Sequence, residues 1–443
     1  MDADTLERTV LDRIVPTAEE IGSMNERAER LIGIIRGYMS EHGIDVEVRL
    51  AGSFSKGTFL ADPDLDVFMM FPESVPRSEM ERVGLMAGEE ILHGERMFSD
   101  HPYTRGVFEG MEVDMVPCYR LESTENLRSA VDRTPFHTRY IKSRLSEGQR
   151  DQVRLLKRFM KGIGTYGAEQ DSRGFSGYLC ELLVVRYGSF RDVLTGCLSW
   201  RSGTAIEIEG RGPKMDSALV VYDPVDPRRN VSSAVHVDTM ARFMHAAAAY
   251  LDSPDERFFF PRGRGALDRD ALEGICGIHG SRLVSVSFPR PDVIEDSLYS
   301  QLWKTQYALC RKLDQHGFGV LRAVHGMDGS SMNVVVELER DTLPRTHRHP
   351  GPPVWVGTSS DFIGRWSGNP HGAPFIEDGR WTVIADRAHT RADGMLESET
   401  AAAGIGRDLD PDSMLVLDHD ATLERMDPSL VTELLSPRFP WEN

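Results

Sequence analysis

The sequence contains no Cys-x-x-Cys pair and no long hydrophobic run. Its five cysteines are scattered over 443 residues, an odd number at spacings that argue against a disulfide framework or a zinc cluster. No apolar segment approaches the ~18 residues of a membrane span. The first residues are acidic and amphipathic, unlike a secretory signal. We therefore expect a soluble cytoplasmic protein with reduced thiols.

Positive charge is scarce in the chain as a whole. Lys and Arg number 51 against 69 Asp and Glu, a net charge of −18. Such a balance argues against nucleic-acid binding driven by bulk charge, although it does not exclude a local basic channel. Residues 128–161 reverse the balance, with ten Lys or Arg and three acids. The sequence therefore points to one concentrated region of positive charge.

An amphipathic helix is predicted within this basic region, over residues 151–161. Four basic side chains recur at helical spacing and share one face: Arg154, Lys157, Arg158 and Lys161. An isolated stripe of this kind is usually a solvated helix face. Because this stripe directly follows the candidate active site described below, we interpret it as a phosphate-binding face.

The length suggests about three domains, and the composition, with 40% apolar and 27% charged residues, is typical of soluble globular proteins. Helices are predicted over residues 2–43 with a break near Pro16. Beyond residue 265 the pattern predicts strands at 282–289, 318–324, 332–339 and 381–385, with helices at 293–316 and from Ser359 or Ser360. The order β-α-β-β-α-β favours a ferredoxin-like sheet with helices on one face.

Three carboxylates in the first third of the chain form the main candidate site. Asp64 and Asp66 enter a predicted strand over residues 66–71, and side chains two apart on a strand point to the same face. Asp114 lies on a second strand, within a hairpin predicted at 106–117 that turns at Gly110. Carboxylates converging from two strands suit Mg²⁺. They are typical of nucleotidyl or phosphoryl transfer with two metal ions.

A glycine-serine turn just upstream strengthens this interpretation, since an acidic pair at a strand end is weak evidence alone. Gly52 lets backbone amides approach phosphate oxygens, and Ser53 adds a hydroxyl donor. Lys56 follows one turn later and can meet a triphosphate as a point charge. The order strand, Gly-Ser, Asp-x-Asp, strand and later Asp is neither a Walker A motif nor GxGxxG. It resembles the polymerase-β-like nucleotidyltransferase superfamily.

Further segments resemble, in order along the chain, the archaeal (class I) CCA-adding enzymes, which are tRNA nucleotidyltransferases. They are GSFSKGTFLADPDLDVFMMFPES, VDMVPCY, SAVDRTPFHTRYI, LLKRFMKGIGTYG, GFSGYLCELL, DPVDPRRNV and HPGPPV. The family's first carboxylate is often Glu, where this chain has Asp64. The resemblance implies an α+β multidomain fold. Its parts would be a nucleotidyltransferase head (1–142), a mainly helical central domain (143–262), a ferredoxin-like (RRM-like) domain (263–390) and a partly helical tail (391–443).

The resemblance also implies residue roles. Asp64 and Asp66 would hold two Mg²⁺ ions, and Asp114 would complete the site and help to activate the 3′-hydroxyl. The implied nucleotide-binding residues are Gly52, Ser53, Lys56, His137, Lys157, Tyr166, Asp226 and Arg229. Taken without the resemblance, His137 and Tyr166 are better explained as structural residues, and the DPVDP segment as a rigid loop bracketed by prolines.

The family's reaction adds C, C and A to the 3′ end of tRNA from CTP and ATP without a nucleic-acid template. Its implied partner is tRNA, contacted at the acceptor stem and TΨC arm by the third domain and tail, and its relatives are homodimers. Candidate basic contacts lie in PRTHRHPG, at Arg345, His347, Arg348 and His349. Two alternatives remain open: an ATP-using enzyme of the poly(A) polymerase or oligoadenylate synthase kind, and a catalytically inactive tRNA-binding protein. The presence of all three carboxylates argues against inactivity.

Overall fold

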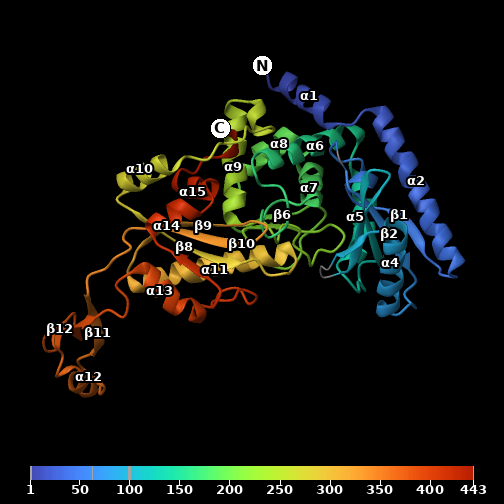
Figure 1. Ribbon diagram of the computed structural model, residues 1–443. Coiled ribbons are helices and arrows are strands. Elements are labelled where there is room, and N and C mark those ends of the chain that lie inside the picture. The colour runs from blue at the N-terminus through green and yellow to red at the C-terminus, as the bar shows by residue number, and fades with distance from the viewer. Residues whose placement is uncertain (1, 62, 98–100, 443) are drawn as a thin grey trace. The chain divides into compact units, whose positions relative to one another are not determined.

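The computed structural model describes residues 2–61, 63–97 and 101–442. The chain divides into two compact units (Figure 1), one of residues 1–263 with 439–443 and one of residues 264–438. The division lies beside the domain boundary expected at residue 262. Most of the expected tail, residues 391–438, lies in the second unit. Among the helices of the described residues, none is long and apolar enough to cross a membrane.

The first unit contains a five-stranded sheet with the order β1-β2-β5-β4-β3. The strands are β1 (Glu47–Leu50), β2 (Leu65–Phe71), β3 (Glu95–Met97), β4 (Tyr103–Phe108) and β5 (Met111–Tyr119). Strands β2 and β5 pair in parallel, whereas the other neighbours are antiparallel. The predicted strand at 66–71 and the hairpin turning at Gly110 are confirmed.

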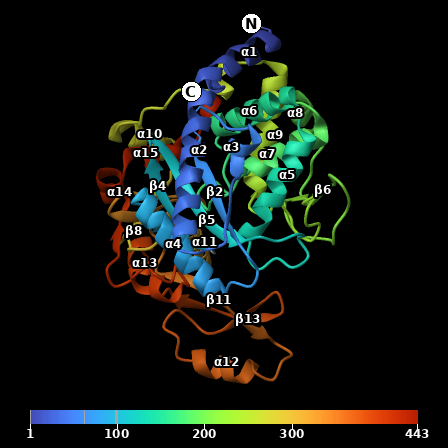
Figure 2. The same ribbon diagram turned by 90° about the vertical axis from the view of Figure 1, so that its right-hand side faces the viewer.

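Two helices, α2 (Ala18–Glu41) and α4 (Arg77–Leu92), pack on one face of this sheet (Figure 2). Alternate residues of β2, beginning with Leu65 and Val67, join the core under these helices. The intervening residues Asp66 and Phe68 therefore point to the opposite face. Phe68 packs there in a small second cluster with Ala51 and Val116. The alternation of β2 thus places the catalytic candidates on the face away from α2 and α4.

The rest of the first unit is mainly helical. Its helices are α1 (Ala3–Ile14), α3 (Gly52–Lys56), η1 (Val131–Arg133), α5 (Thr134–Arg144), α6 (Glu147–Gly162), α7 (Gly177–Tyr187), α8 (Phe190–Cys197), α9 (Val237–Asp252), η2 (Glu256–Phe258) and η4 (Pro440–Glu442). A short parallel pair, β6 (Thr204–Ile206) and β7 (Leu219–Val221), accompanies them. Leu6, Val10 and Ile14 of α1 pack with α6 to α9 and not with the head sheet, as does Trp441 near the C-terminus. Both ends of the chain therefore complete the central core.

The second unit contains a four-stranded antiparallel sheet with the order β14-β8-β10-β9. Its strands are β8 (Arg282–Pro289), β9 (Val320–Met327), β10 (Ser331–Leu338) and β14 (Leu415–Leu417). The accompanying helices are α10 (Arg269–His279), α11 (Glu295–His316), α13 (Ala392–Glu399), η3 (Thr400–Ala402), α14 (His419–Arg425) and α15 (Pro428–Leu435). The predicted first strand, long helix and hairpin are confirmed.

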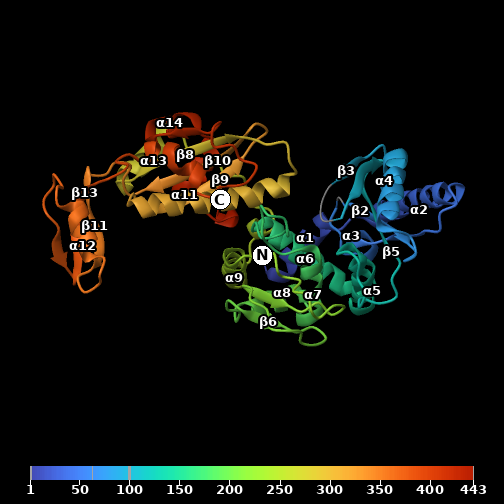
Figure 3. The ribbon, with the colours of Figure 1, turned by 90° about the horizontal axis from the view of Figure 1, so that it is seen from below.

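The strand predicted at 381–385 is present, but its predicted place in this sheet was wrong. Residues 381–385 lie in β13 (Arg380–Asp386), which pairs with β11 (Thr346–Pro353) and β12 (Phe375–Glu377) in a separate sheet. With α12 (Ser359–Trp366) these strands form a small module that extends from the rest of the second unit (Figure 3). The place beside β8 is taken by β14, where Val416 pairs with Val286. β14 has only three residues and lies in an acidic stretch, so the alternation of apolar and polar residues is too short there to predict a strand.

Candidate active site

Asp66 and Asp114 are partners in the parallel register of β2 and β5. They therefore lie side by side on the sheet face that α2 and α4 leave uncovered. Asp64 precedes β2 and is exposed, and its charge interacts with those of Asp66 and Asp114. The structure brings Asp66 and Asp114 together and places Asp64 close enough for its charge to interact with both.

The negative charges at this site are not balanced. Burial, followed by the charges of Asp114 and Asp64, raises the pKa of Asp66 to about 6, although Lys56 and Arg105 oppose the shift. Burial, followed by the charge of Glu112, also raises the pKa of Asp64. Clustered carboxylates with raised pKa values gain from a cation that neutralises them. Oxygen donors of this kind fit a hard divalent ion.

Sequence reasoning missed Arg105, which holds the third carboxylate. Its Nε donates a hydrogen bond to Oδ1 of Asp114, and its Nη2 donates one to Oδ2, at 2.7 Å each. The two residues are partners in the β4–β5 register. Among the residues that the structure describes, no three His, Cys, Asp or Glu side chains are close enough together to hold a metal ion. Metal binding therefore requires these side chains to rearrange and a cation to compete with Arg105 for Asp114.

Gly52 makes room for the Asp66 carboxylate. Its φ is +60°, and a Cβ at this position would lie 1.7 Å from Oδ2 of Asp66. A side chain here would therefore be both strained and in collision with the carboxylate. The sequence suggested only that this glycine admits phosphate oxygens. Ser53 follows in the first turn of α3, where it is half-buried.

Lys56 and Lys157 meet a buried carboxylate that the sequence analysis did not identify. Nζ of Lys56 lies 2.6 Å from Oε2 of Glu181, and Nζ of Lys157 lies 3.5 Å from Oε1 and donates to the Thr58 carbonyl at 3.1 Å. Burial lowers the pKa of Lys157. Burial opposes ionisation of Glu181, but the charges of Lys56 and Lys157 outweigh it and lower that pKa. The signal available in the sequence was a lone acid in the apolar helix α7.

The basic side chains of α6 do not form the open phosphate-binding face that the sequence predicted. Arg154 is buried and donates to the Phe59 carbonyl and to Asp151, and Arg158 donates to the Phe259 carbonyl. Only Lys161 of the four is exposed, 5.2 Å from the Tyr166 ring centre. The prediction failed because these arginines and Lys157 satisfy carbonyls and acids of neighbouring segments.

His137 joins a second buried network, centred on Asp223. Its Nε2 lies 2.8 Å from Oδ2 of Asp223, and its ring stacks on Tyr178 with centroids 4.0 Å apart. Arg229 donates to the same carboxylate at 3.0 Å. Burial lowers the pKa of His137, although Asp223 opposes the shift. Neither Asp223 nor Tyr178 was identified from the sequence, although Asp223 begins the DPVDP segment.

The two other expected nucleotide contacts flank these networks. Asp226 accepts a hydrogen bond of 3.1 Å from Nε of Arg133. The Tyr166 hydroxyl and the Lys157 ammonium both approach Gly177, where an added Cβ would lie 3.0 and 3.4 Å from them. Burial raises the pKa of Tyr166, which keeps its hydroxyl protonated. The structure therefore arranges the expected nucleotide contacts around Glu181 and Asp223.

Comparisons with known proteins show which family the chain resembles. Three family models match in succession: a nucleotidyltransferase domain at residues 32–137, the second domain of tRNA nucleotidyltransferase at 151–260, and the C-terminal domain of CCA-adding enzyme at 279–414. The CCA-adding enzyme of Methanothermobacter thermautotrophicus is 40% identical over 86% of this chain and 85% of its own. The chain belongs to the CCA-adding enzyme family.

Other members of the family cover the chain equally well. The CCA-adding enzymes of Methanoregula boonei and Halobacterium salinarum are 38% and 37% identical, over 90% and 91% of this chain and 88% and 91% of theirs. Among solved structures, E. coli CdnC with ATP has a TM-score of 0.46 and 18% identity, over 58% of this chain and 95% of its own. The Cid1 poly(U) polymerase has a TM-score of 0.45 and 14% identity, over 57% and 94%. The functional assignment rests on the family members.

Proposed function

We propose that this protein completes the 3′ end of tRNA by adding C, C and A from CTP and ATP, with release of pyrophosphate and without a template. Membership of the CCA-adding enzyme family carries this proposal, and the pairing of Asp66 with Asp114 across β2 and β5 supplies a site for the chemistry. The same membership favours CCA addition over a poly(A) polymerase, an oligoadenylate synthase or an inactive tRNA-binding protein.

Asp64, Asp66 and Asp114 would hold the divalent metal of the reaction, which we propose to be two Mg²⁺ ions. When bound, these ions lower the pKa of the attacking hydroxyl and stabilise the leaving pyrophosphate. Asp66 pairs with Asp114 across the two strands and lies against Gly52, which leaves room for its carboxylate. Asp114 becomes available as Arg105 releases it, and it then lies beside Asp66 to orient the 3′-hydroxyl. In-line attack depends on this positioning.

The incoming nucleotide would lie between the carboxylates and the two buried networks. Ser53 and Lys56 would face the triphosphate with Gly52, and Lys157 and Tyr166 would extend that contact. His137, Asp226 and Arg229 would contact the base and sugar. Arg229 has 35% of its side chain exposed while bonded to Asp223, so its guanidinium retains donors for a base edge. The bond to Asp223 limits the positions that this guanidinium can adopt.

The second unit would bind tRNA. We propose that β8, α11, β9, β10, α13 and β14 form a ferredoxin-like fold, because the order β14-β8-β10-β9 places its strands as that fold requires. The acceptor stem and TΨC arm would lie against this unit, with Arg345, His347, Arg348 and His349 as candidate contacts. Recognition of this kind reads the shape of duplex RNA. The working form would be a cytoplasmic homodimer.

The deciding experiment uses purified protein, Mg²⁺ and a tRNA that ends at the discriminator base. CTP and ATP are supplied separately and then together, and the products are sized. Two added C residues with CTP alone, and one further A when ATP is present, are the expected result. A ladder of A residues with ATP alone would point to a poly(A)-type enzyme. Asp66→Ala should abolish incorporation and leave tRNA binding nearly unchanged; surviving incorporation would contradict the metal assignment.

A further inference from the structure

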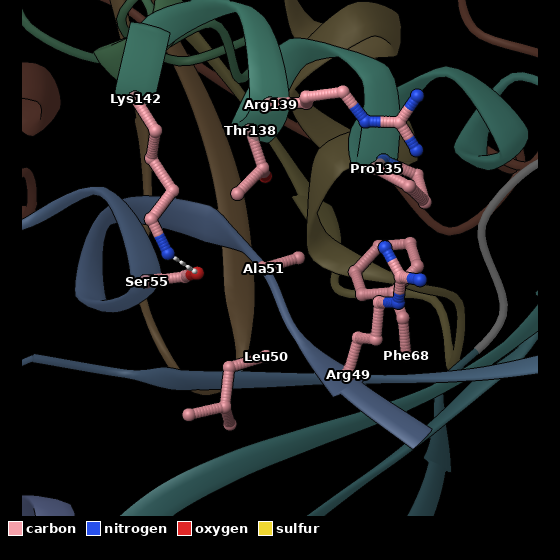
Figure 4. A pocket seen from close by; sticks show the side chains of 9 residues that line it. All are labelled: Arg49, Leu50, Ala51, Ser55, Phe68, Pro135, Thr138, Arg139 and Lys142. Carbon is pink, nitrogen blue, oxygen red and sulfur yellow. Dashed lines mark hydrogen bonds between the residues drawn. The ribbon is translucent and has the colours of Figure 1, made fainter. Parts of the chain in front are cut away.

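A pocket of about 200 Å³ lies between β1, α3 and α5 (Figure 4). Its lining includes three cations, Arg49, Arg139 and Lys142, and no acidic residue. Phe68, with Leu50 and Ala51, supplies an apolar floor. A water occupies about 30 Å³ in the liquid, so the pocket has room for a group several times larger. Its lining is suited to a small anion.

The pocket lies on the catalytic face of the sheet but apart from the nucleotide contacts. Phe68 and Asp66 are two residues apart on β2 and share that face, which separates them by about 7 Å along the strand. On α3, Lys56 contacts Glu181, whereas the neighbouring Ser55 accepts a hydrogen bond of 3.3 Å from Lys142 of α5. The pocket therefore opens on the other side of α3 from the buried lysine network.

Two of the three cations are not neutralised. Among the described residues, neither Arg139 nor Lys142 forms an ion pair, and both are exposed. Arg49 differs, because Glu47 pairs with its guanidinium. Elsewhere on the same helix, Arg144 pairs with Glu209. In a chain with a net charge of −18, two neighbouring cations without an acidic partner give this pocket a local positive potential that attracts anions.

A buried hydroxyl adds an independent sign of a ligand. Thr138 lines the pocket and is only 7% exposed. Its Oγ1 has no hydrogen-bond partner within the described part of the chain. Buried polar groups are nearly always hydrogen-bonded, because an unmade bond costs about 1–3 kcal/mol. A phosphate oxygen in the pocket would accept from this hydroxyl once the Thr138 side chain turns toward it.

We propose that this pocket is a phosphate subsite formed by Arg139, Lys142 and Thr138. The proposal rests on the proposed function for its two sources of phosphate, the pyrophosphate released by addition and a backbone phosphate of the tRNA acceptor strand. Either would accept charge-assisted hydrogen bonds from Arg139 and Lys142. If pyrophosphate occupies the pocket, it would bind there on its way out of the active site. If an RNA phosphate occupies it, the pocket would position the tRNA acceptor strand near Asp66.

The first arm of the test titrates the full chain with inorganic pyrophosphate in EDTA, by calorimetry. Without metal the carboxylates at Asp64, Asp66 and Asp114 repel the anion, so binding reports on cationic sites. Arg139→Gln and Lys142→Gln should each weaken binding about tenfold, the loss of one charge-assisted hydrogen bond. Arg144→Gln, an equal charge change on the same helix, should have no effect. Thr138→Val should weaken binding without lowering the melting temperature.

The second arm measures binding of a tRNA that ends at the discriminator base. If the pocket takes an RNA phosphate, Lys142→Gln weakens tRNA binding about tenfold, and the effect vanishes when one of the last three linkages is a neutral methylphosphonate. An effect in the first arm alone assigns the pocket to pyrophosphate. Unchanged binding in both arms overturns the proposal. Failure of the wild-type chain to add CCA would contradict the proposed function. It would not change what the pyrophosphate titration in EDTA shows about the pocket.

Discussion

The Arg105 guanidinium donates to both carboxylate oxygens of Asp114, its partner in the β4–β5 register, at 2.7 Å each. This bidentate pair gives one of the three clustered carboxylates a counter-ion within the protein. Asp66, beside it, has no comparable partner among the residues that the structure describes, and its pKa is raised to about 6. The site is therefore asymmetric in its metal-free form.

Arg105→Ala should expose this asymmetry. Removing the guanidinium leaves Asp114 and Asp66 in uncompensated repulsion, so the metal-free protein should lose about 1 kcal/mol of stability at neutral pH. A divalent cation then has no competitor for Asp114 and should bind more tightly. Thermal unfolding in EDTA and in Mg²⁺ tests both effects: Mg²⁺ should raise the melting temperature more in the variant than in the wild type. An equal rise in both would show that Arg105 does not compete with metal.

Asp66→Asn should stabilise the metal-free protein at neutral pH. The folded-state pKa of Asp66, about 6, is higher than that of an unfolded Asp, so folding favours its protonated form. Stability from this group is present below about pH 4 and is lost as the pH rises through 6. The free energy of unfolding of the variant should therefore be about 2–3 kcal/mol higher than that of the wild type at pH 8. Near pH 4 the variant and the wild type should be equally stable.

Denaturant unfolding in EDTA at pH 4 and pH 8 measures this difference. A gap that stays constant between the two pH values would show that ionisation of Asp66 is not its cause. The same variant should incorporate no CMP, because a neutral amide is a poor ligand for Mg²⁺.

Gly52→Ala tests the close approach of the glycine turn to the catalytic carboxylate. The added methyl would overlap Oδ2 of Asp66, so the carboxylate must move. Displacement of a reacting group by about 1 Å can cost a factor of about 100 in rate, and we expect a loss of that size in kcat. Gly43→Ala is the matched control: its φ of +69° is equally unfavourable, but no atom lies within 4 Å of the added carbon.

Gly43→Ala should therefore cost about 1 kcal/mol of stability and leave kcat unchanged. Equal losses of activity in the two variants would attribute the effect to backbone strain. Steady-state incorporation of CMP and denaturant unfolding of both proteins decide between the two explanations.

Glu181→Gln tests the buried carboxylate between two lysines. Removing its charge leaves Lys56 and Lys157 buried side by side without a counter-ion, which should cost about 3–5 kcal/mol. Glu109→Gln breaks the exposed pair with Arg30 and should change stability by less than about 1 kcal/mol. Urea unfolding of the two variants gives the comparison. Similar small losses would mean that the lysines are uncharged in the folded protein.

Binding of tRNA should weaken steeply with salt despite the acidic surface. Each phosphate contact with Lys or Arg releases counter-ions, so the logarithm of the affinity falls linearly with the logarithm of the salt concentration. Fluorescence anisotropy between about 50 and 200 mM salt measures the slope, where contacts to several phosphates lower the affinity by orders of magnitude. A flat affinity over this range would contradict binding through contacts of Lys or Arg with RNA phosphates.

Local patterns in the sequence were sufficient for the elements and motifs near the catalytic carboxylates. A run of apolar residues predicted β2, the turn at Gly110 predicted the β4–β5 hairpin, and the spacing of Asp64, Asp66 and Asp114 predicted a metal-binding chemistry. The prediction of a phosphate-binding face on α6 failed where periodicity could not reveal what packs against the helix. Arg154 and Lys157 are long side chains that satisfy carbonyls near Thr58, far away in sequence.

The candidate carboxylates, the glycine turn and most strands could be predicted from the sequence, because spacing, turn residues and apolar patterning are all visible within short segments. Strand register in the hairpin brings Arg105 to Asp114, and the folded chain makes two pairings across long separations: Lys56 with Glu181, and β14 beside β8 in place of β13. Such pairings depend on the closure of long loops and on competition between edges of a sheet. Periodicity, which is a local property, carries no information about either.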